Sequence, residues 1–198
     1  MKLQSELPQG VTVDGRYYKL DLDFRNVLNL QDTLARDDLL PEARAYCALK
    51  CVLKKPRNVP KVLKAVREML FPATRKTADK TKITDFVQDA DLIRAAFMQA
   101  YGINLFRDKL HWFEFSALLA GLPEGSRYSE VLGIRARPMP KPTKWNAEER
   151  QWLARAKAEL AVRLTDKERE MSLEKSLQSV ALSLLTLAEK GGTNNNGG

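Results

Sequence analysis

The run from Thr84 to Pro138 constrains the fold most, because it contains two helix patterns that each end at a glycine. In the first pattern, apolar residues recur at every third or fourth position, which places them on one face of an α-helix. Glycine suits the left-handed conformation that commonly follows a helix C-terminus. We therefore expect an amphipathic helix that ends at Gly102. Its apolar face consists of Phe86, Ala90, Ile93, Phe97 and Tyr101.

The second pattern extends from Asp108 to Gly121 and is apolar on almost every side. Asp108 is expected to cap the start of this helix, and Gly121 with Pro123 ends it. A helix that is apolar all round is a buried one. The sequence therefore predicts that this helix forms the centre of the core, with its neighbours packed around it. A short third helical segment and a proline-rich run follow.

The N-terminal part predicts one β-hairpin followed by three helices. Asp14-Gly15 is a two-residue hairpin signal between alternating apolar residues, which places the hairpin at residues 11–23. Helix starts are expected at Asp23, Pro41 and Asn58. The residues expected to face the core in these helices are Phe24, Val27, Leu28, Leu30, Leu34, Tyr46, Leu49, Val52, Leu53, Val62, Val66 and Leu70. The predicted fold class is mainly α, with a small N-terminal β-hairpin packed on a compact helical core.

The proline-rich residues 138–145 divide the chain, because proline favours an extended, semi-rigid connector. Residues 1–137 are thus expected to form the core domain, and residues 146–190 a C-terminal amphipathic helix or helix pair. Asn146 and Glu149 form a capping pair at the start of that segment, and Thr165 with Glu168 forms a second one. Residues 191–198 read GGTNNNGG, a low-complexity tail that has nothing to bury and is expected to be disordered.

The composition is that of a globular protein, with 44% hydrophobic and 29% charged residues and a formal net charge of +8. No apolar run approaches the roughly 20 residues that a bilayer span requires. The N-terminus lacks the apolar core of a secretory signal. Cys47 and Cys51 lie one helical turn apart, which is a poor geometry for a disulfide, and they are expected to be buried as small apolar residues. A reducing cytoplasm is the expected compartment.

Few residues suggest chemistry. His111 is the only histidine, and we expect it to be a half-buried, hydrogen-bonded residue that fixes local packing. The chain contains no serine elbow, phosphate-binding loop, dinucleotide fingerprint or EF-hand pattern. Carboxylates cluster at Asp85, Asp89 and Asp91, where they interact favourably with a helix dipole; metal binding there is the weaker interpretation. The sequence therefore predicts a protein that is not an enzyme and that has no cofactor and no metal.

The segment between Lys54 and Lys82 carries ten basic and two acidic residues, so the rest of the chain is neutral in sum. Proteins that read single-stranded nucleic acid interleave aromatic residues with such charge, and Phe71 is the sole aromatic residue here. A solvated basic face, or one that docks on an acidic protein, is the preferred interpretation. A nucleic-acid site would instead place this basic patch against phosphates: Lys54, Lys55, Arg57, Lys61, Lys64 and Arg67.

Apolar residues near the C-terminus form a seam of about two heptads. The seam either folds back on the chain's own core or pairs with a second copy or a partner helix. The proline-rich linker favours pairing with another chain. The seam consists of Leu173, Leu177, Val180, Leu184 and Leu187.

Three runs, DFVQDADLIRAAFMQAYGINL, LHWFEFSALLAGLP and YSEVLGIR, resemble a family of long-tailed bacteriophage (siphophage) proteins. The resemblance covers residues 84–137 well and residues 7–35 loosely, and it does not include residues 140–198. The shared motif is a packing signature rather than a catalytic one. Its residues here are Phe86, Asp89, Tyr101, Gly102, His111, Trp112, Gly121, Leu122, Pro123 and Gly133.

The genes of this family lie between those of the major tail protein and the tail tape measure protein, and its members are taken to be tail assembly chaperones. The resemblance implies a protein of the host bacterial cytoplasm that binds the tape measure protein and keeps it soluble. Other tail proteins and a second copy of this chain are further expected partners, whereas a membrane is not. The alternative hypothesis is a basic accessory phage protein that binds nucleic acid.

Overall fold

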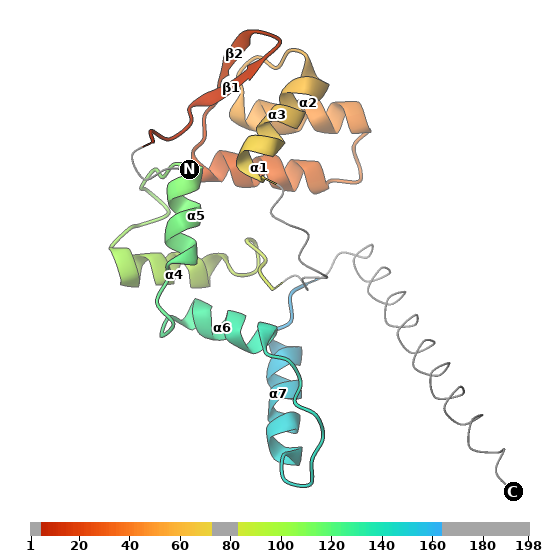
Figure 1. Ribbon diagram of the computed structural model, residues 1–198, viewed down its shortest axis with the longest axis vertical. Helices are drawn as coiled ribbons and strands as arrows, with labels where there is room; N and C mark the ends of the chain where they lie inside the picture. The colour runs from red at the N-terminus through yellow and green to blue at the C-terminus, as the bar shows by residue number, and fades with distance from the viewer. Residues whose placement is uncertain (1–4, 73–82, 164–198) are drawn as a thin grey trace, which may run out of the picture. The chain divides into compact units, whose positions relative to one another are not determined.

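The computed structural model describes residues 5–72 and 83–163. The chain divides into a unit Met1–Leu160 and a unit Ala161–Gly198, and every named element belongs to the first. The prediction of a mainly helical fold with a small N-terminal hairpin is confirmed (Figure 1). The C-terminal seam from Leu173 to Leu187 lies outside the described residues. In chain order the elements are β1 Gly10–Val13, β2 Arg16–Lys19, α1 Phe24–Ala35, α2 Pro41–Val52, α3 Val59–Leu70, α4 Ala90–Tyr101, α5 Trp112–Ala120, α6 Arg127–Ala136 and α7 Ala147–Glu159.

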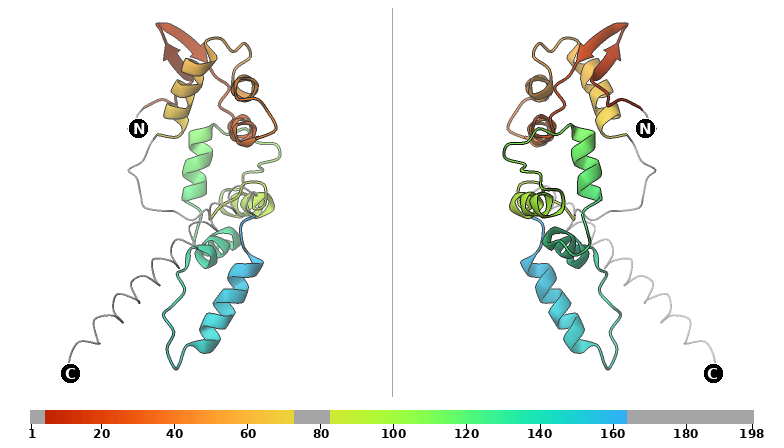
Figure 2. Two further views of the ribbon diagram at one scale, coloured as in Figure 1. Left: turned by 90° about the vertical axis from the view of Figure 1, so that its right-hand side faces the viewer. Right: turned by 90° about the vertical axis from the view of Figure 1, so that its left-hand side faces the viewer.

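The predicted hairpin is present, and it turns at Asp14 and Gly15, whose φ angles are 49° and 73°. Two successive positive φ angles are characteristic of the type I′ turn, which matches the right-handed twist of the strands. A two-stranded sheet needs a surface to pack on. Here the hairpin lies against α3, as both Figure 1 and Figure 2 show. Asn58 Nδ2 and Lys61 Nζ both donate to Asp14 Oδ2, at 2.9 and 2.8 Å, and so tie the turn to the start of α3.

Helices α1, α2 and α3 form the first part of the core around Val27, Leu30, Leu49, Val62 and Val66, all of which are fully buried. The predicted starts of α1 and α2 are confirmed, and α3 begins directly after Asn58. The expectation that Tyr46 faces the core is wrong, since its side chain is 45% exposed. The buried face of α2 instead passes through Ala48, Leu49 and Val52.

The predicted start of the central helix at Asp108 is wrong, because α5 begins at Trp112. The backbone before it is extended: Phe24 N–H donates to Leu110 O at 3.0 Å, and Trp112 N–H donates to Leu22 O at 2.8 Å. These two bonds pair the extended backbone at Leu110 and His111 with the segment that leads into α1, so the chain enters the helix only at Trp112. The Asp108 carboxylate accepts from Asn104 N–H at 2.7 Å and closes a separate turn.

Helix α5 is less buried than its composition predicts, and only Trp112 and Phe115 are buried in it. Phe115 is nevertheless the centre of the aromatic core. Its ring stacks on Phe24 at 4.5 Å and on Phe97 at 5.3 Å between centroids. Phe86 and Trp112 lie 6.2 and 6.0 Å away. One residue of α5 therefore connects α1 and α4, which are distant in the sequence.

Helix α4 begins at Ala90 rather than at Phe86, which lies in the turn before it. Its end at Gly102, with φ 67°, is as predicted.

Helix α6 packs on α4 and on α7, and Leu153 of α7 is fully buried. Helix α7 follows Asn146 as expected, but this side chain does not cap it. Asn146 accepts from Thr143 N–H and donates to Lys141 O in the preceding connector, at 2.9 and 2.8 Å.

Candidate functional site

The side chains that could act in catalysis or metal binding instead make contacts that stabilise the fold. Among the described residues, no group of three or more His, Cys, Asp or Glu could hold a metal ion. His111 Nδ1 accepts from Phe113 N–H at 3.3 Å and caps α5, while Glu114 accepts from His111 N–H at 3.0 Å. Since Nδ1 is the acceptor, the proton lies on Nε2, which donates to Pro8 O at 3.0 Å. Both ring nitrogens thus hold the backbone in place.

The two cysteines are free thiols. Cys47 is exposed, so the expectation that both are buried is wrong. The reason is the orientation of α2, which turns Ala48 and Leu49 inward instead. Cys51 is half-buried, and its Sγ lies 3.8 Å from Thr33 Oγ1 on α1. Neither thiol has a basic residue in hydrogen-bonding contact in the described part of the chain that would activate it as a nucleophile.

The three carboxylates predicted to cluster at the start of α4 each make a different contact. Asp89 forms a buried ion pair with Arg135 of α6, and the two side chains are only 1% and 6% exposed. Asp85 accepts from Val87 N–H and Gln88 N–H, both at 2.9 Å. Asp91 pairs with Arg94 on the surface at 2.9 Å. The cluster is therefore part of the scaffold.

Arg135 connects four segments of the chain through one guanidinium group. It donates to both carboxylate oxygens of Asp89 at 2.7 and 2.8 Å, to Ile83 O at 2.9 Å, and to Leu160 O at 2.5 Å. Such bidentate, charge-assisted contacts are strong and geometrically specific. Tyr128 lies near the pair, where desolvation raises the pKa of its hydroxyl. The Asp89–Arg135 pair fixes the start of α4 and the end of α7 on α6.

The other motif residues also have packing roles. Tyr101 donates to Leu118 O at 2.8 Å and so joins α4 to α5. Gly121 ends α5, and a Cβ there would lie 3.4 Å from the Tyr101 hydroxyl. Leu122 packs against the core, and Pro123 O accepts from Ser126 N–H at 3.0 Å. Gly133 lies within α6, where a Cβ would meet nothing within 4 Å.

The residues of the predicted basic patch are all exposed, and they are divided between the α2–α3 loop and α3: Lys54, Lys55, Arg57, Lys61, Lys64 and Arg67. Part of this charge is used within the protein. Lys61 holds Asp14 of the hairpin, and this hydrogen bond lowers the pKa of Asp14. Lys64 lies 4.0 Å from Glu68 on the same helix. Phe71 packs edge-on against Trp112 at 5.7 Å between ring centroids, with 36% of its surface exposed.

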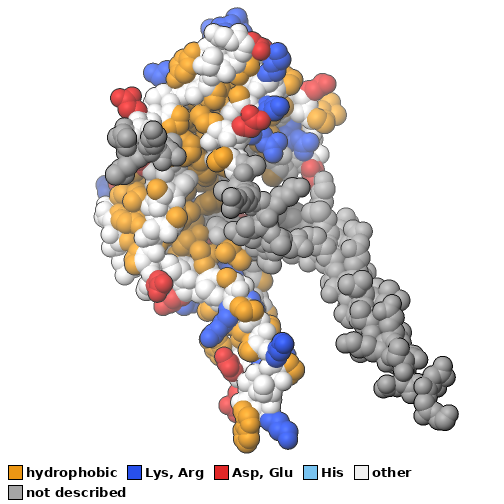
Figure 3. All heavy atoms as spheres, in the orientation of Figure 1, with side chains coloured by type: hydrophobic (Ala, Val, Ile, Leu, Met, Phe, Trp, Pro, Cys, Tyr) orange, Lys and Arg blue, Asp and Glu red, His pale blue; other side chains and the backbone are white. Residues whose placement is uncertain are grey.

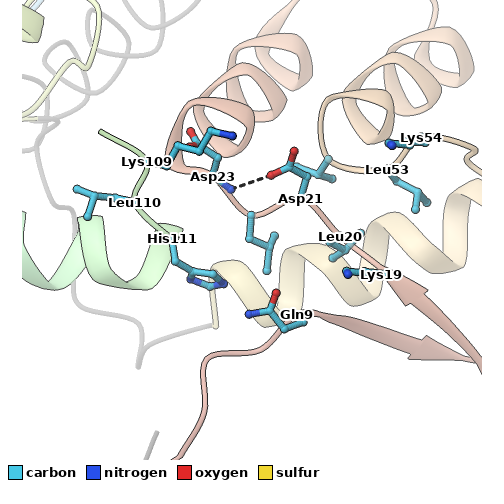
Figure 4. A pocket seen from close by; sticks show the side chains of 12 residues that line it. Gln9, Lys19, Leu20, Asp21, Asp23, Leu53, Lys54, Lys109, Leu110 and His111 are labelled. Carbon is cyan, nitrogen blue, oxygen red and sulfur yellow. Dashed lines mark hydrogen bonds between the residues drawn. The ribbon is translucent and has the colours of Figure 1, made fainter. Parts of the chain in front are cut away.

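A lysine-rimmed hollow of about 630 Å³ lies where the hairpin, the end of α2 and the start of α5 meet. Figure 4 shows Lys19, Lys54 and Lys109 around it, from three different segments. Asp21 and Asp23 also line it, and Asp21 accepts from Asp23 N–H at 3.3 Å. Three lysines and two aspartates therefore line this hollow, so its charge is not of one sign.

A second hollow, the α1–α4 groove, has a volume of about 300 Å³ and a mainly apolar lining, with polar side chains along α1. Helices α1 and α4 both pack on α5 but not on each other, so an open space remains between them. The aromatic residues Phe24, Phe86 and Phe115 line this space. Figure 3 shows apolar side chains at the surface over α4 and α5. The α1–α4 groove is the described hollow that most resembles a protein-binding site.

Two large apolar side chains line the α1–α4 groove although water reaches most of their surface. Val87 is 75% exposed and Phe106 is 69% exposed. Arg94 lies over the Phe106 ring at 4.4 Å from its centroid and holds it in place. Exposed apolar residues that gather along a hollow are typical of interaction surfaces.

No sequence pattern predicted this groove. One signal was available in α1, where Arg25, Leu28, Asn29 and Asp32 recur at the spacing of a single helix face. These residues form the α1 wall. The opposite wall could not be foreseen, because it depends on how far α4 lies from α1.

Comparisons with known proteins give one match. A family model described as "Bacteriophage Gp15 protein" matches residues 3–162. No curated protein and no solved structure matches the chain. Across the described residues, no helix has both the length and the apolar character that crossing a membrane requires.

Proposed function

We propose, from the premise that the chain belongs to the Bacteriophage Gp15 protein family, that this phage protein is a non-enzymatic tail assembly chaperone. In this proposal it binds the tail tape measure protein in the host cytoplasm and keeps it soluble until the tail subunits cover it. The premise establishes a phage protein, and the link to tail assembly comes from the resemblance to siphophage proteins encoded beside the tape measure gene.

The observation that carries the proposal is the α1–α4 groove. A chaperone of a long helical protein must cover apolar helix surface reversibly. An amphipathic helix that lays its apolar face into a hydrophobic groove is a common mode of such recognition. The groove offers exposed Val87 and Phe106 together with aromatic Phe24, Phe86 and Phe115. These residues supply apolar contact without requiring any reaction.

Co-expression with the tape measure protein encoded beside this gene tests the proposal. We expect the tape measure protein to remain soluble with the chain and to precipitate without it, and the two proteins to co-purify. The C-terminal seam provides a second contact to be tested in the same assay, by replacing Leu177 and Leu184 with aspartate. A tape measure protein whose solubility does not depend on the chain would contradict the proposal.

Nucleic-acid binding remains the second candidate, supported by the exposed charge of Lys54, Lys55, Arg57 and Arg67. Phosphate contacts release counterions, so this binding would weaken by orders of magnitude between about 50 and 200 mM salt if six or more phosphates were contacted. Apolar helix docking would change little over the same range. A salt titration with labelled single-stranded and double-stranded DNA, beside the tape measure protein, separates the two functions.

A further inference from the structure

We propose that the α1–α4 groove binds an amphipathic helix of the tape measure protein that carries a lysine or arginine beside its apolar face, and that Asp32 selects this cation. The inference rests on the proposed function and adds the chemistry of the bound segment and the residue that recognises it.

The dimensions of the α1 wall suit a helix as the bound segment. The wall residues extend from Arg25 to Asp32. At 1.5 Å per residue this wall is about 10 Å long, or two helical turns. A bound helix would therefore present apolar residues at positions i, i+3 or i+4, and i+7. Because α1 and α4 do not pack on each other while both rest on α5, the third helix would complete a layer above Phe115.

The charges along the groove distinguish Asp32 from its neighbours. The Arg25 guanidinium pairs with Asp23 at 3.1 Å and donates to Leu105 O and Asp108 O, both at 2.8 Å. Arg94 pairs with Asp91 and covers the Phe106 ring. Both arginines are thus committed to contacts within the protein.

Asp32 differs from both arginines in its contacts. In residues 5–72 and 83–163 its carboxylate has neither an ion pair nor a hydrogen bond. Desolvation by the surrounding protein raises its pKa, and the negative charge of Asp85 raises it further. Asp32 is exposed, so its desolvation is partial, but its charge still lies beside that of Asp85 at the edge of the groove, and a cation placed there would offset this repulsion. Charge complementarity therefore indicates that the bound helix carries a lysine or arginine beside its apolar face.

The test uses the full chain and overlapping 25-residue peptides that cover the neighbouring tape measure protein. Binding is measured by fluorescence anisotropy. We expect the peptides that bind to be amphipathic and to carry a lysine or arginine flanking the apolar face. Replacing Asp32 with lysine should weaken their binding about tenfold, since close charge pairs across interfaces are often coupled by at least that factor. Replacing the cation of the peptide with glutamate should restore binding to the Asp32→Lys variant.

Two controls match the variants in the groove. Glu124→Lys makes the same charge change at an exposed position outside the groove and should alter binding less than twofold. Leu40→Ala shortens an apolar side chain that is 78% exposed and lies away from the groove. It should leave binding unchanged, whereas Phe106→Ala should weaken it.

Asp32→Asn separates binding from folding. It removes the unfavourable charge, so the variant should unfold at an equal or higher urea concentration than the wild type while it binds the cationic peptides less tightly. A residue with only a structural role would not lose binding while keeping stability.

The outcomes distinguish the two ideas. If the wild-type chain binds no tape measure peptide, the proposed function fails and this inference fails with it. If the wild type binds but Asp32→Lys and Phe106→Ala bind equally well, the inference alone is wrong. It is also wrong if groove variants dissociate a dimer of the chain in sedimentation velocity without affecting peptide binding, because the occupant is then a second copy.

Discussion

Replacing Arg135 with methionine is the most informative perturbation of the fold. The substitution keeps much of the side-chain volume but leaves Asp89 buried without a counter-charge, at 1% exposure. It also removes the donors to Ile83 O and Leu160 O. Removing one partner of a buried ion pair costs about 3–5 kcal/mol. A domain of this kind has a total stability of roughly 5–15 kcal/mol, so the variant should lose a large fraction of it.

The expected loss of stability comes from the unpaired Asp89 charge and not only from the lost contacts. A second variant separates these two causes. Replacing Asp89 with leucine in the Arg135→Met background removes the orphaned carboxylate. Exchange of a whole buried pair for apolar residues is often neutral or favourable. We therefore expect the double variant to be more stable than Arg135→Met alone. The matched surface control is Asp91→Asn, which breaks an exposed pair with Arg94 and should cost less than about 1 kcal/mol.

The assay is urea unfolding followed by far-ultraviolet circular dichroism at neutral pH, with the free energies compared at equal slopes. The reasoning is refuted if Arg135→Met costs less than about 1 kcal/mol, the range of a surface ion pair. It is also refuted if the double variant is less stable than Arg135→Met. In either case the pair would not be the element that fixes α4 and α7 on α6.

Three further predictions concern local structure. Gly102→Ala should lower the free energy of unfolding by about 1 kcal/mol, because φ 67° strains a residue with a Cβ; urea unfolding measures it. His111→Ala should cost about 1 kcal/mol through loss of the α5 cap, whereas His111→Asn should cost less because its side-chain oxygen can accept the same N–H bond. The pKa of Asp14 lies below 3.8 in the folded protein, so its contribution is present above pH 3.8 and is lost as the pH falls through the lowered value. The protection factors of the hairpin amides, which correct for the intrinsic pH dependence of exchange, should therefore fall in acid in the wild type, and an Asp14→Ala variant should show no such step.

Local chemistry made much of the fold predictable. The Asp14-Gly15 turn follows from residues that tolerate positive φ, and Asp23 caps α1 through its own carboxylate, which accepts from Arg25 N–H at 3.0 Å. Gly102 ends α4 for the same backbone reason. Each of these features depends on interactions within a few residues of the chain, and such interactions can be read from a sequence.

Long-range pairing explains where the predictions were wrong. Asp108 is a good helix cap in isolation, but the backbone at Leu110 and His111 pairs with the segment before α1, so the cap lies three residues later, at His111. Tyr46 has suitable apolar spacing, but the orientation of α2 against α1 and α3 exposes it. In both cases a contact with a distant part of the chain outweighed a local preference.

The amino-acid sequence by itself determined the helical class, the hairpin, several helix ends and the family motif, because periodicity and capping are local properties. Tertiary structure alone decided that Asp89 pairs with Arg135, 46 residues away, and that Phe115 stacks on both Phe24 of α1 and Phe97 of α4. It also left Asp32 facing a groove without a partner among the described residues. These features depend on distances between helices, and such distances arise only when side chains from separate segments pack together.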